Sequence, residues 1–141
     1  MKKIILSIII FLTTCFSVFS HINHYKDYSY LEYELFRNNK LIGYHKYNFT
    51  RKDNFLTVDS KVNFKIKKLG VELYNYFAES REIYKNDLFF KFSSKTNQNK
   101  KEKYVNITNV NKDNELLIDG SSFKGKTSSD FIVGTWWNHQ I

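Results

Sequence analysis

Apolar and polar side chains alternate along the segment FLTVDSKVNFKIKK, which runs from Phe55 to Lys68. A β-strand sends successive side chains to opposite faces, whereas a helix would scatter the lysines of this segment around its surface. The segment is therefore predicted to be a strand with one face on a core and the other in solvent. The face predicted to be buried carries Leu56, Val58, Val62, Phe64 and Ile66, and the other carries Thr57, Asp59, Lys61, Asn63, Lys65 and Lys67.

Segments of the same kind recur along the chain, joined by short turns rich in Asn, Asp, Lys and Gly, and the chain has no proline. This spacing of turn signals predicts an all-β fold, an antiparallel meander in a single domain. Long strands joined by tight turns twist and coil, so we expect a strongly curved sheet, a half-barrel or a small barrel with an apolar concave face. Strands are expected at 28–37, 41–51, 55–68, within 69–87, and at 88–97, 104–110 and 116–120, followed by a loop at 121–130.

The segment 69–87 is the most ambiguous of these, because its first half also fits a helix. Alternation favours a long strand that places Val71, Leu73 and Phe77 on one face, with a bulge near 78–82. Glu79 and Arg81 share a face of this strand, and we expect them to form an ion pair.

The first twenty residues have the three parts of a secretory signal peptide. Lys2 and Lys3 precede an apolar stretch, and Ser20 fits the last position before a cleavage site. We expect residues 1–20 to be removed, 21–27 to form a flexible N-terminus and 28–141 to form the β domain, in the periplasm or outside the cell. The alternative is a lipoprotein anchored at Cys15, because LTTC loosely resembles a lipoprotein cleavage box. Cys15 is the only cysteine, so no disulfide is expected.

The chain is basic, with 22 Lys and Arg residues against 14 Asp and Glu and a net charge of +8. Basic chains often bind nucleic acid. Arginine, which makes most base and bidentate phosphate contacts, occurs here only at positions 37, 51 and 81. We therefore expect no nucleic-acid partner, and only a weak attraction to anionic headgroups. The cluster of Lys100, Lys101 and Lys103 is expected to be a solvated hairpin loop, with a headgroup contact as the alternative.

Three stretches together, LIGYHKYNF, ESREIYKNDLFF and TSSDFIVGTWWN, resemble a family of secreted bacterial proteins that carry a domain of unknown function. The resemblance covers essentially the whole mature chain and implies no catalytic role for any residue. More distantly, such a curved sheet is similar to the periplasmic lipoprotein carriers and the lipocalin-like folds. The matching positions are Gly43, His45, Glu82, Leu88, Trp137 and Asn138, whereas Tyr84 stands where the family tends to have Trp.

The chain ends shortly after its two tryptophans, Trp136 and Trp137. The resemblance implies further strands beyond this point. A terminal strand without a partner leaves unpaired backbone N–H and C=O groups that can pair with another chain. We therefore expect the chain to be truncated at its C-terminus. The alternative is that the tryptophans close the open end of a small barrel.

Candidate reactive residues are few, and no nucleophile motif, phosphate loop or metal-spaced cluster is found. His45 falls on the inward face of its strand and is expected to be a hydrogen-bonded core residue. His21 and His24 would suit a copper site at the mature N-terminus, but no third ligand is placed, so no metal and no other cofactor is expected. Paired serines at 93–94, 121–122 and 128–129 are expected in loops.

These observations favour an exported, non-enzymatic protein that binds an apolar or lipid-like ligand on the concave face of its sheet. The candidate ligand-binding residues are His45, Glu82 and Trp137. The alternative is an interaction module of the cell envelope that pairs with a protein partner through an edge strand. An enzyme that uses His45 and Glu82 would require the two side chains to lie within hydrogen-bonding distance.

Overall fold

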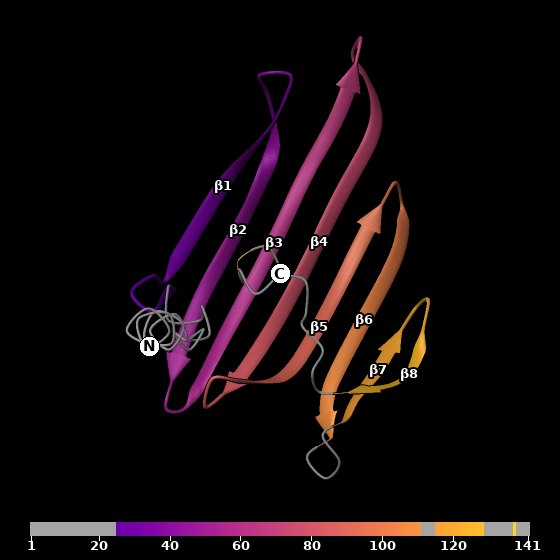
Figure 1. Cartoon of the computed structure of the whole chain (residues 1–141). Helices are drawn as coiled ribbons and strands as arrows, with labels where there is room; N and C mark the ends of the chain where they lie inside the picture. The colour runs from indigo at the N-terminus through magenta and orange to yellow at the C-terminus, as the bar shows by residue number, and fades with distance from the viewer. Residues whose placement is uncertain (1–24, 111–114, 129–136, 138–141) are drawn as a thin grey trace, which may run out of the picture. The chain divides into compact units, whose positions relative to one another are not determined.

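The computed structural model describes residues 25–110, 115–128 and 137. The chain divides into two compact units, residues 27–133 and the two ends of the chain, residues 1–26 and 134–141. In the larger unit the described residues form one eight-stranded sheet whose strands follow the order of the sequence (Figure 1). The strands are β1 (Tyr30–Arg37), β2 (Lys40–Lys52), β3 (Phe55–Lys68), β4 (Val71–Lys85), β5 (Leu88–Gln98), β6 (Lys101–Val110), β7 (Glu115–Gly120) and β8 (Lys124–Ser128).

The expected all-β antiparallel meander is confirmed, since every neighbouring pair of strands is antiparallel. The sheet is not closed into a barrel, because in the described part of the chain β1 pairs only with β2 and β8 only with β7. The strands β2, β3 and β4 have 13, 14 and 15 residues, well above the usual strand length of about 5 or 6. Among the described residues, no helix is long and apolar enough to span a bilayer.

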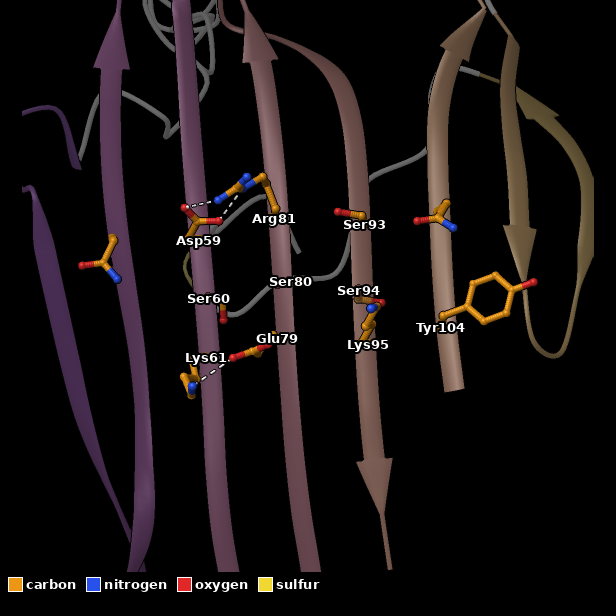
Figure 2. A pocket seen from close by; sticks show the side chains of 12 residues that line it. Asp59, Ser60, Lys61, Glu79, Ser80, Arg81, Ser93, Ser94, Lys95 and Tyr104 are labelled. Atoms are coloured by element: carbon orange, nitrogen blue, oxygen red, sulfur yellow. Dashed lines mark hydrogen bonds and ion pairs between the residues drawn. The ribbon is translucent and has the colours of Figure 1, made fainter. Parts of the chain in front are cut away.

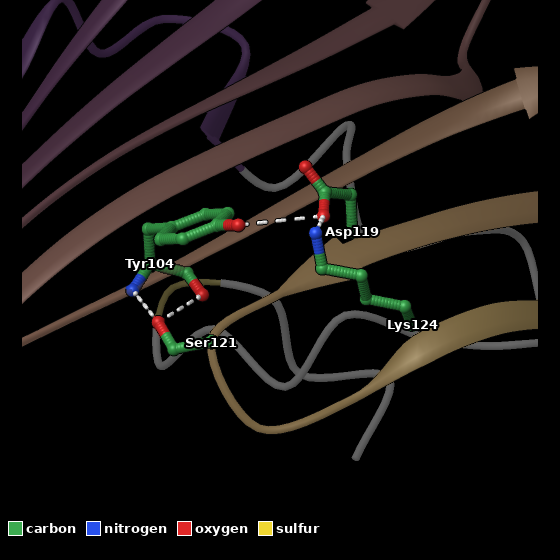
Figure 3. A network of polar contacts seen from close by, with 4 residues as sticks. All are labelled: Tyr104, Asp119, Ser121 and Lys124. Carbon is green, nitrogen blue, oxygen red and sulfur yellow. Dashed lines mark hydrogen bonds and ion pairs between the residues drawn. The ribbon is translucent and has the colours of Figure 1, made fainter.

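The loop expected at 121–130 contains a strand, β8, which pairs with β7 from Lys124 to Ser128. A polar network at the β7–β8 turn holds this hairpin against β6 (Figure 3). The Ser121 hydroxyl oxygen accepts a hydrogen bond of 2.6 Å from the Tyr104 amide, and Lys124 pairs with Asp119 at 2.8 Å. The strand was missed because its residues, among them Gly, Ser and Lys, are typical of loops and show no alternation of apolar and polar side chains.

Three bulges shift the register of the sheet, each by one extra residue on one strand. The extra residues are Ile42 in β2, Leu73 in β4 and Phe90 in β5. The bulge expected near 78–82 is therefore wrong, since pairing is regular there. A one-residue slip moves the following side chains to the other face. Because of the bulge at Leu73, Val71 and Phe77 lie on opposite faces of the sheet, whereas we expected them on the same face.

The buried side chains of the sheet all lie on one face. Cross-strand partners share a face, and the register aligns Phe49, Val58, Glu82, Phe92 and Ile107 across five strands. Phe92, Ile107 and Leu116 form a core cluster, against which Phe89, Val105 and Ile118 pack. The other buried side chains of this face are Tyr47, Leu56 and Tyr84.

In the smaller unit, Tyr25 and Trp137 are buried and their rings meet edge to face, with centroids 5.9 Å apart at 76°. This arrangement is a favourable aromatic geometry. The expected signal peptide, Cys15, His21, His24 and Trp136 lie outside the described residues, as does most of the expected C-terminal strand.

Candidate functional site

The sheet presents two chemically different surfaces. We call the face that holds the buried side chains the apolar face and the opposite face the charged face. On the charged face, oppositely charged residues stand directly across from each other on neighbouring strands. The ion pairs between partners in register are Glu32–Lys46, Lys61–Glu79, Asp59–Arg81 and Asp119–Lys124. Glu115 and Lys126 form a diagonal pair, since Lys126 is the register partner of Leu117.

A hollow of about 610 Å³ opens over β2 to β6 on the charged face (Figure 2). Figure 2 shows Arg81 turned toward Asp59 and Lys61 turned toward Glu79 across the two central strands. The Arg81 guanidinium makes two hydrogen bonds to the Asp59 carboxylate, at 2.6 and 3.1 Å, and these hydrogen bonds raise the pKa of Arg81. Lys61 lies 2.9 Å from Glu79. The expected Glu79–Arg81 pair is therefore wrong, because each residue finds a closer partner directly across on β3.

The charges that line this hollow largely neutralise one another. The side chains of Lys61 and Glu79 are more than half exposed, at 56% and 53%. Exposed pairs of this kind contribute little to stability and are screened by salt. A hollow whose central charges are already paired offers little net attraction to a charged ligand.

The buried end of the apolar face contains one carboxylate, Glu82, which is fully buried in β4. It accepts a hydrogen bond of 2.8 Å from the hydroxyl group of Tyr84, two residues along the same strand. A buried carboxylate is stable only when such partners replace water. The bulge at Leu73 sets the register that puts Glu82 opposite Val58 on this face, and Glu82 belongs to the core.

His45 lies on the apolar face at the boundary between the buried and the half-exposed regions. Its Nε2 atom is hydrogen-bonded to the Ser60 hydroxyl at 2.8 Å, and its Nδ1 atom to the Tyr47 hydroxyl at 3.2 Å. Burial lowers the pKa of His45, which favours the neutral ring. The expectation of an inward, hydrogen-bonded histidine is confirmed.

Three stacked rings, which we call the aromatic ladder, continue the apolar face beyond His45. Phe64 of β3 lies between Tyr74 and Tyr76 of β4, with ring centroids 5.8 and 5.2 Å apart. All three rings are only partly buried. The ladder was not predicted, because the sequence assignment placed Phe77 rather than its neighbours on this face. Phe77 instead lies on the charged face, where the Lys61 ammonium group approaches its ring at 5.1 Å.

Small side chains occupy the apolar face between the ladder and the core. The register places Ser60, Ser80 and Ser94 in one row across β3, β4 and β5, and Val62, Ala78 and Thr96 in the next. Ser94 was expected in a loop but lies within a strand. The serine and threonine hydroxyls of these rows can donate and accept hydrogen bonds.

His45 and Glu82, two of the predicted site residues, do not come together. Phe49 pairs with Val58 and Val58 with Glu82, so Glu82 is level with Phe49, four residues from His45 along β2. Four residues span about 13 Å and two strand spacings about 10 Å, so His45 and Glu82 do not share a hydrogen bond. Trp137 lies in the smaller unit. Across the described ranges, no group of three or more His, Cys, Asp or Glu side chains is placed to hold a metal ion.

A protein-family comparison identifies the chain from residue 33 to residue 141 as a domain of unknown function, DUF6134. The chain belongs to the DUF6134 family. No curated protein and no solved structure matches it significantly. The expected membership of a family of unknown function is therefore confirmed, and the match begins within β1 and includes the strands β2 to β8. The aromatic ladder of this DUF6134 domain lies within the matched residues, as does His45 with its hydrogen-bond partners Ser60 and Tyr47.

Proposed function

We propose that this DUF6134 domain binds an amphipathic, lipid-like molecule along the half-exposed end of its apolar face. The observation that carries the proposal is the aromatic ladder. Apolar side chains that continue from a core onto an exposed surface mark binding sites more often than isolated exposed residues do. Three stacked rings supply a large, rigid apolar surface of the kind that holds an acyl chain.

The polar groups beside the ladder suit the other end of such a molecule. Ligand sites are mostly apolar, with a few fixed polar groups that orient the ligand. His45, held by Ser60 and Tyr47, is such a fixed group, and the row of small residues leads from it toward β5. A ligand with an acyl chain on the ladder would therefore bring its polar end to the hydroxyl groups of this row.

We propose a binding role rather than catalysis. The separation of His45 and Glu82 supports this, because these two side chains, the candidates for catalysis, cannot exchange a proton directly. Glu82 is committed to Tyr84 in the core. The predicted signal peptide supports a location outside the cytoplasm, where the ligand would be a lipid of the cell envelope.

Consecutive residues of β4 provide a matched test. Tyr76→Ser removes a ring of the ladder, whereas Phe77→Ser removes a ring of similar size from the charged face. We expect Tyr76→Ser to weaken binding of a fluorescent fatty acid by about tenfold, because roughly 1.4 kcal/mol of apolar contact is lost. Phe77→Ser is expected to leave binding within twofold. Equal binding by the two folded variants, or no binding by the original protein, would contradict the proposal.

A second candidate function rests on the edge strand β1. In the described residues its outer side has no strand partner, and its eight residues present Tyr33 with 46% exposure. An exposed edge of this length can accept a strand from an envelope protein. Site-specific photocrosslinking from Tyr33 in intact cells tests this: one discrete protein adduct supports it, and exclusive crosslinking to lipid supports the first proposal.

A further inference from the structure

The hairpin between β3 and β4 extends past its neighbours in the sheet. Pairing of β2 with β3 stops at Phe64, and pairing of β5 with β4 begins only at Tyr76. The outer part, residues 67–73, therefore forms strand pairs only within itself among the described residues, at the turn between the two strands (Figure 1). We call this part the β3–β4 tip. Its position makes it the first part of these two strands to meet a surface that approaches end-on.

The tip carries an apolar side chain at the position where other hairpins of this sheet carry polar ones. Leu69 is 96% exposed and has a positive φ of 50°. The other non-glycine residues with positive φ are all polar: Asn38, Asn39, Asp53, Asn86, Asp87, Asn99 and Lys100. Asn and Asp tolerate this conformation far better than an apolar residue does. In the folded protein Leu69 therefore has neither a favourable backbone conformation nor a buried side chain.

Two more exposed apolar residues, Val71 and Leu73, follow Leu69 in the tip with 62% and 56% exposure. Three neighbouring apolar side chains in water are unfavourable unless another phase or molecule covers them. The apolar tip thus needs an apolar partner that approaches along the strand direction.

Lysines surround the approach to the tip. On the charged face a hollow of about 580 Å³ lies along β2 and β3, lined by five lysines and by no acidic residue. These are Lys40, Lys46, Lys61, Lys65 and Lys67. Lys46, Lys61 and Lys65 are paired with Glu32, Glu79 and Glu72. Lys40, Lys67 and, at the turn, Lys68 form no ion pair among the described residues, although the Lys67 charge also lowers the pKa of the Glu72 carboxyl. The surroundings of the apolar tip are therefore positively charged.

We propose that the β3–β4 tip docks this protein onto the surface of an anionic phospholipid bilayer. Leu69 and its apolar neighbours enter the boundary between headgroups and acyl chains, while Lys40, Lys67 and Lys68 contact lipid phosphates. Interfacial binding of this kind combines buried apolar area with attraction of Lys to anionic lipid. Long lysine side chains can reach the headgroups while their methylene groups lie along the apolar side chains.

This inference does not depend on the proposed function, because it concerns a bilayer surface and a different part of the sheet. A protein could bind a single amphiphile on the aromatic ladder without docking on a membrane. It could equally dock through the tip without carrying a ligand.

The first experiment measures sedimentation of the full chain with vesicles of phosphatidylcholine containing 30 mol% phosphatidylglycerol. Leu69→Asn installs the residue type that the other turns use, so the fold should be at least as stable as before. We expect this variant to bind about tenfold more weakly, because an apolar contact with the acyl region is lost. Leu88→Asn is the matched control, because Leu88 is 73% exposed beside the turn at the opposite end of β4, and it should bind normally.

The second experiment locates the contact, so that binding by other parts of the chain does not obscure it. An environment-sensitive fluorophore is attached through Leu69→Cys or Leu88→Cys, each in a Cys15→Ser background. Addition of the same vesicles should shift the emission of the label at position 69 to shorter wavelength and leave the label at position 88 unchanged. Lys67→Gln combined with Lys68→Gln should weaken vesicle binding about tenfold or more, and pure phosphatidylcholine should bind all variants weakly.

Several outcomes would overturn the proposal. An unshifted label at position 69, or an equal shift at position 88, would show that the tip does not enter the bilayer. Equal vesicle binding by Leu69→Asn and the original chain would do the same. If soluble heparin bound the original chain and Leu69→Asn equally, and displaced both from vesicles, the lysines would be a polyanion site rather than part of a membrane contact.

Discussion

Leu116 and Leu117 are consecutive in β7 and lie on opposite faces of the sheet: Leu116 is 1% exposed and packs with Phe92 and Ile107, whereas Leu117 is 47% exposed. The same residue type is therefore placed once in the core and once on the charged face. Because the residue type is the same, substitutions at the two positions measure how much burial of the side chain contributes to stability.

Leu116→Ala should lower the free energy of unfolding by about 2–4 kcal/mol, because it removes buried apolar contacts and leaves a cavity. Leu117→Ala should change it by less than about 0.5 kcal/mol, as exposed substitutions usually do. Urea titration of the two variants checks this. Similar losses would mean that the faces of β7 are reversed.

Gly43 and Gly70 predict different effects of adding a methyl group. A Cβ atom on Gly43 would lie 2.0 Å from the carbonyl oxygen of Asn63 and 2.5 Å from the Cα atom of Phe64. Gly43→Ala should therefore cost about 3 kcal/mol or more, because backbone atoms of the β2–β3 ladder must move. At Gly70 no atom lies within 4 Å, but φ is +81°, so Gly70→Ala should cost about 1–2 kcal/mol. Thermal unfolding of both variants ranks them, and a less stable Gly70→Ala would contradict the register at Gly43.

The Asp59–Arg81 pair should contribute little to stability despite its good geometry. The side chains are 59% exposed for Arg81 and 38% for Asp59, so water screens their attraction. A double-mutant cycle with Asp59→Asn and Arg81→Gln should give a coupling energy of about 0.2–1 kcal/mol. The coupling should shrink in 1 M salt. A coupling that does not respond to salt would show that the pair is shielded from solvent.

Acidification should destabilise the protein partly through His45. Burial lowers the pKa of the folded His45 ring below its unfolded value of about 6.5, so in this range the unfolded chain binds more protons. The stability contribution of the neutral ring is therefore present above about pH 6.5 and is lost as the pH falls toward the lower folded pKa.

Urea midpoints at pH 7.5 and 5.0 measure this effect. The difference between the two midpoints should be smaller for His45→Gln than for the original protein, because the variant lacks the titrating ring. The His45 share cannot exceed about 1.4 kcal/mol per pH unit, the limit for one proton. An identical pH response in the two proteins would contradict a buried, neutral His45.

Much of the sheet was predictable from the period of the sequence. The alternation in β3 assigned Leu56, Val58 and Phe64 to one face, and the register confirms that assignment. The turns followed from Asn and Asp, residues that accept positive φ, as at Asn38 and Asn86. These signals come from residues that are close together in the sequence, so they can be recognised in a single sequence.

The site was less predictable, because it depends on pairing between distant strands. The stacking of Phe64 with Tyr76 requires the bulge at Leu73, and nothing in the local alternation marks that residue as the extra one. Ser60 becomes the partner of His45 only once the β2–β3 register is fixed. The turn between these strands, KDN at residues 52–54, could have supplied that register, since it places Ser60 opposite Tyr47.

Strand order that follows chain order has a consequence for how this molecule can be assembled. Each new strand needs only the one synthesised just before it, so the sheet can grow hairpin by hairpin as the polypeptide emerges. Contacts that are close in sequence form without the delay of closing long loops. In every partly formed sheet the newest strand would have unpaired backbone N–H and C=O groups on its outer side. Among the described strands, this unpaired position would be held by each strand in turn from β2 to β8.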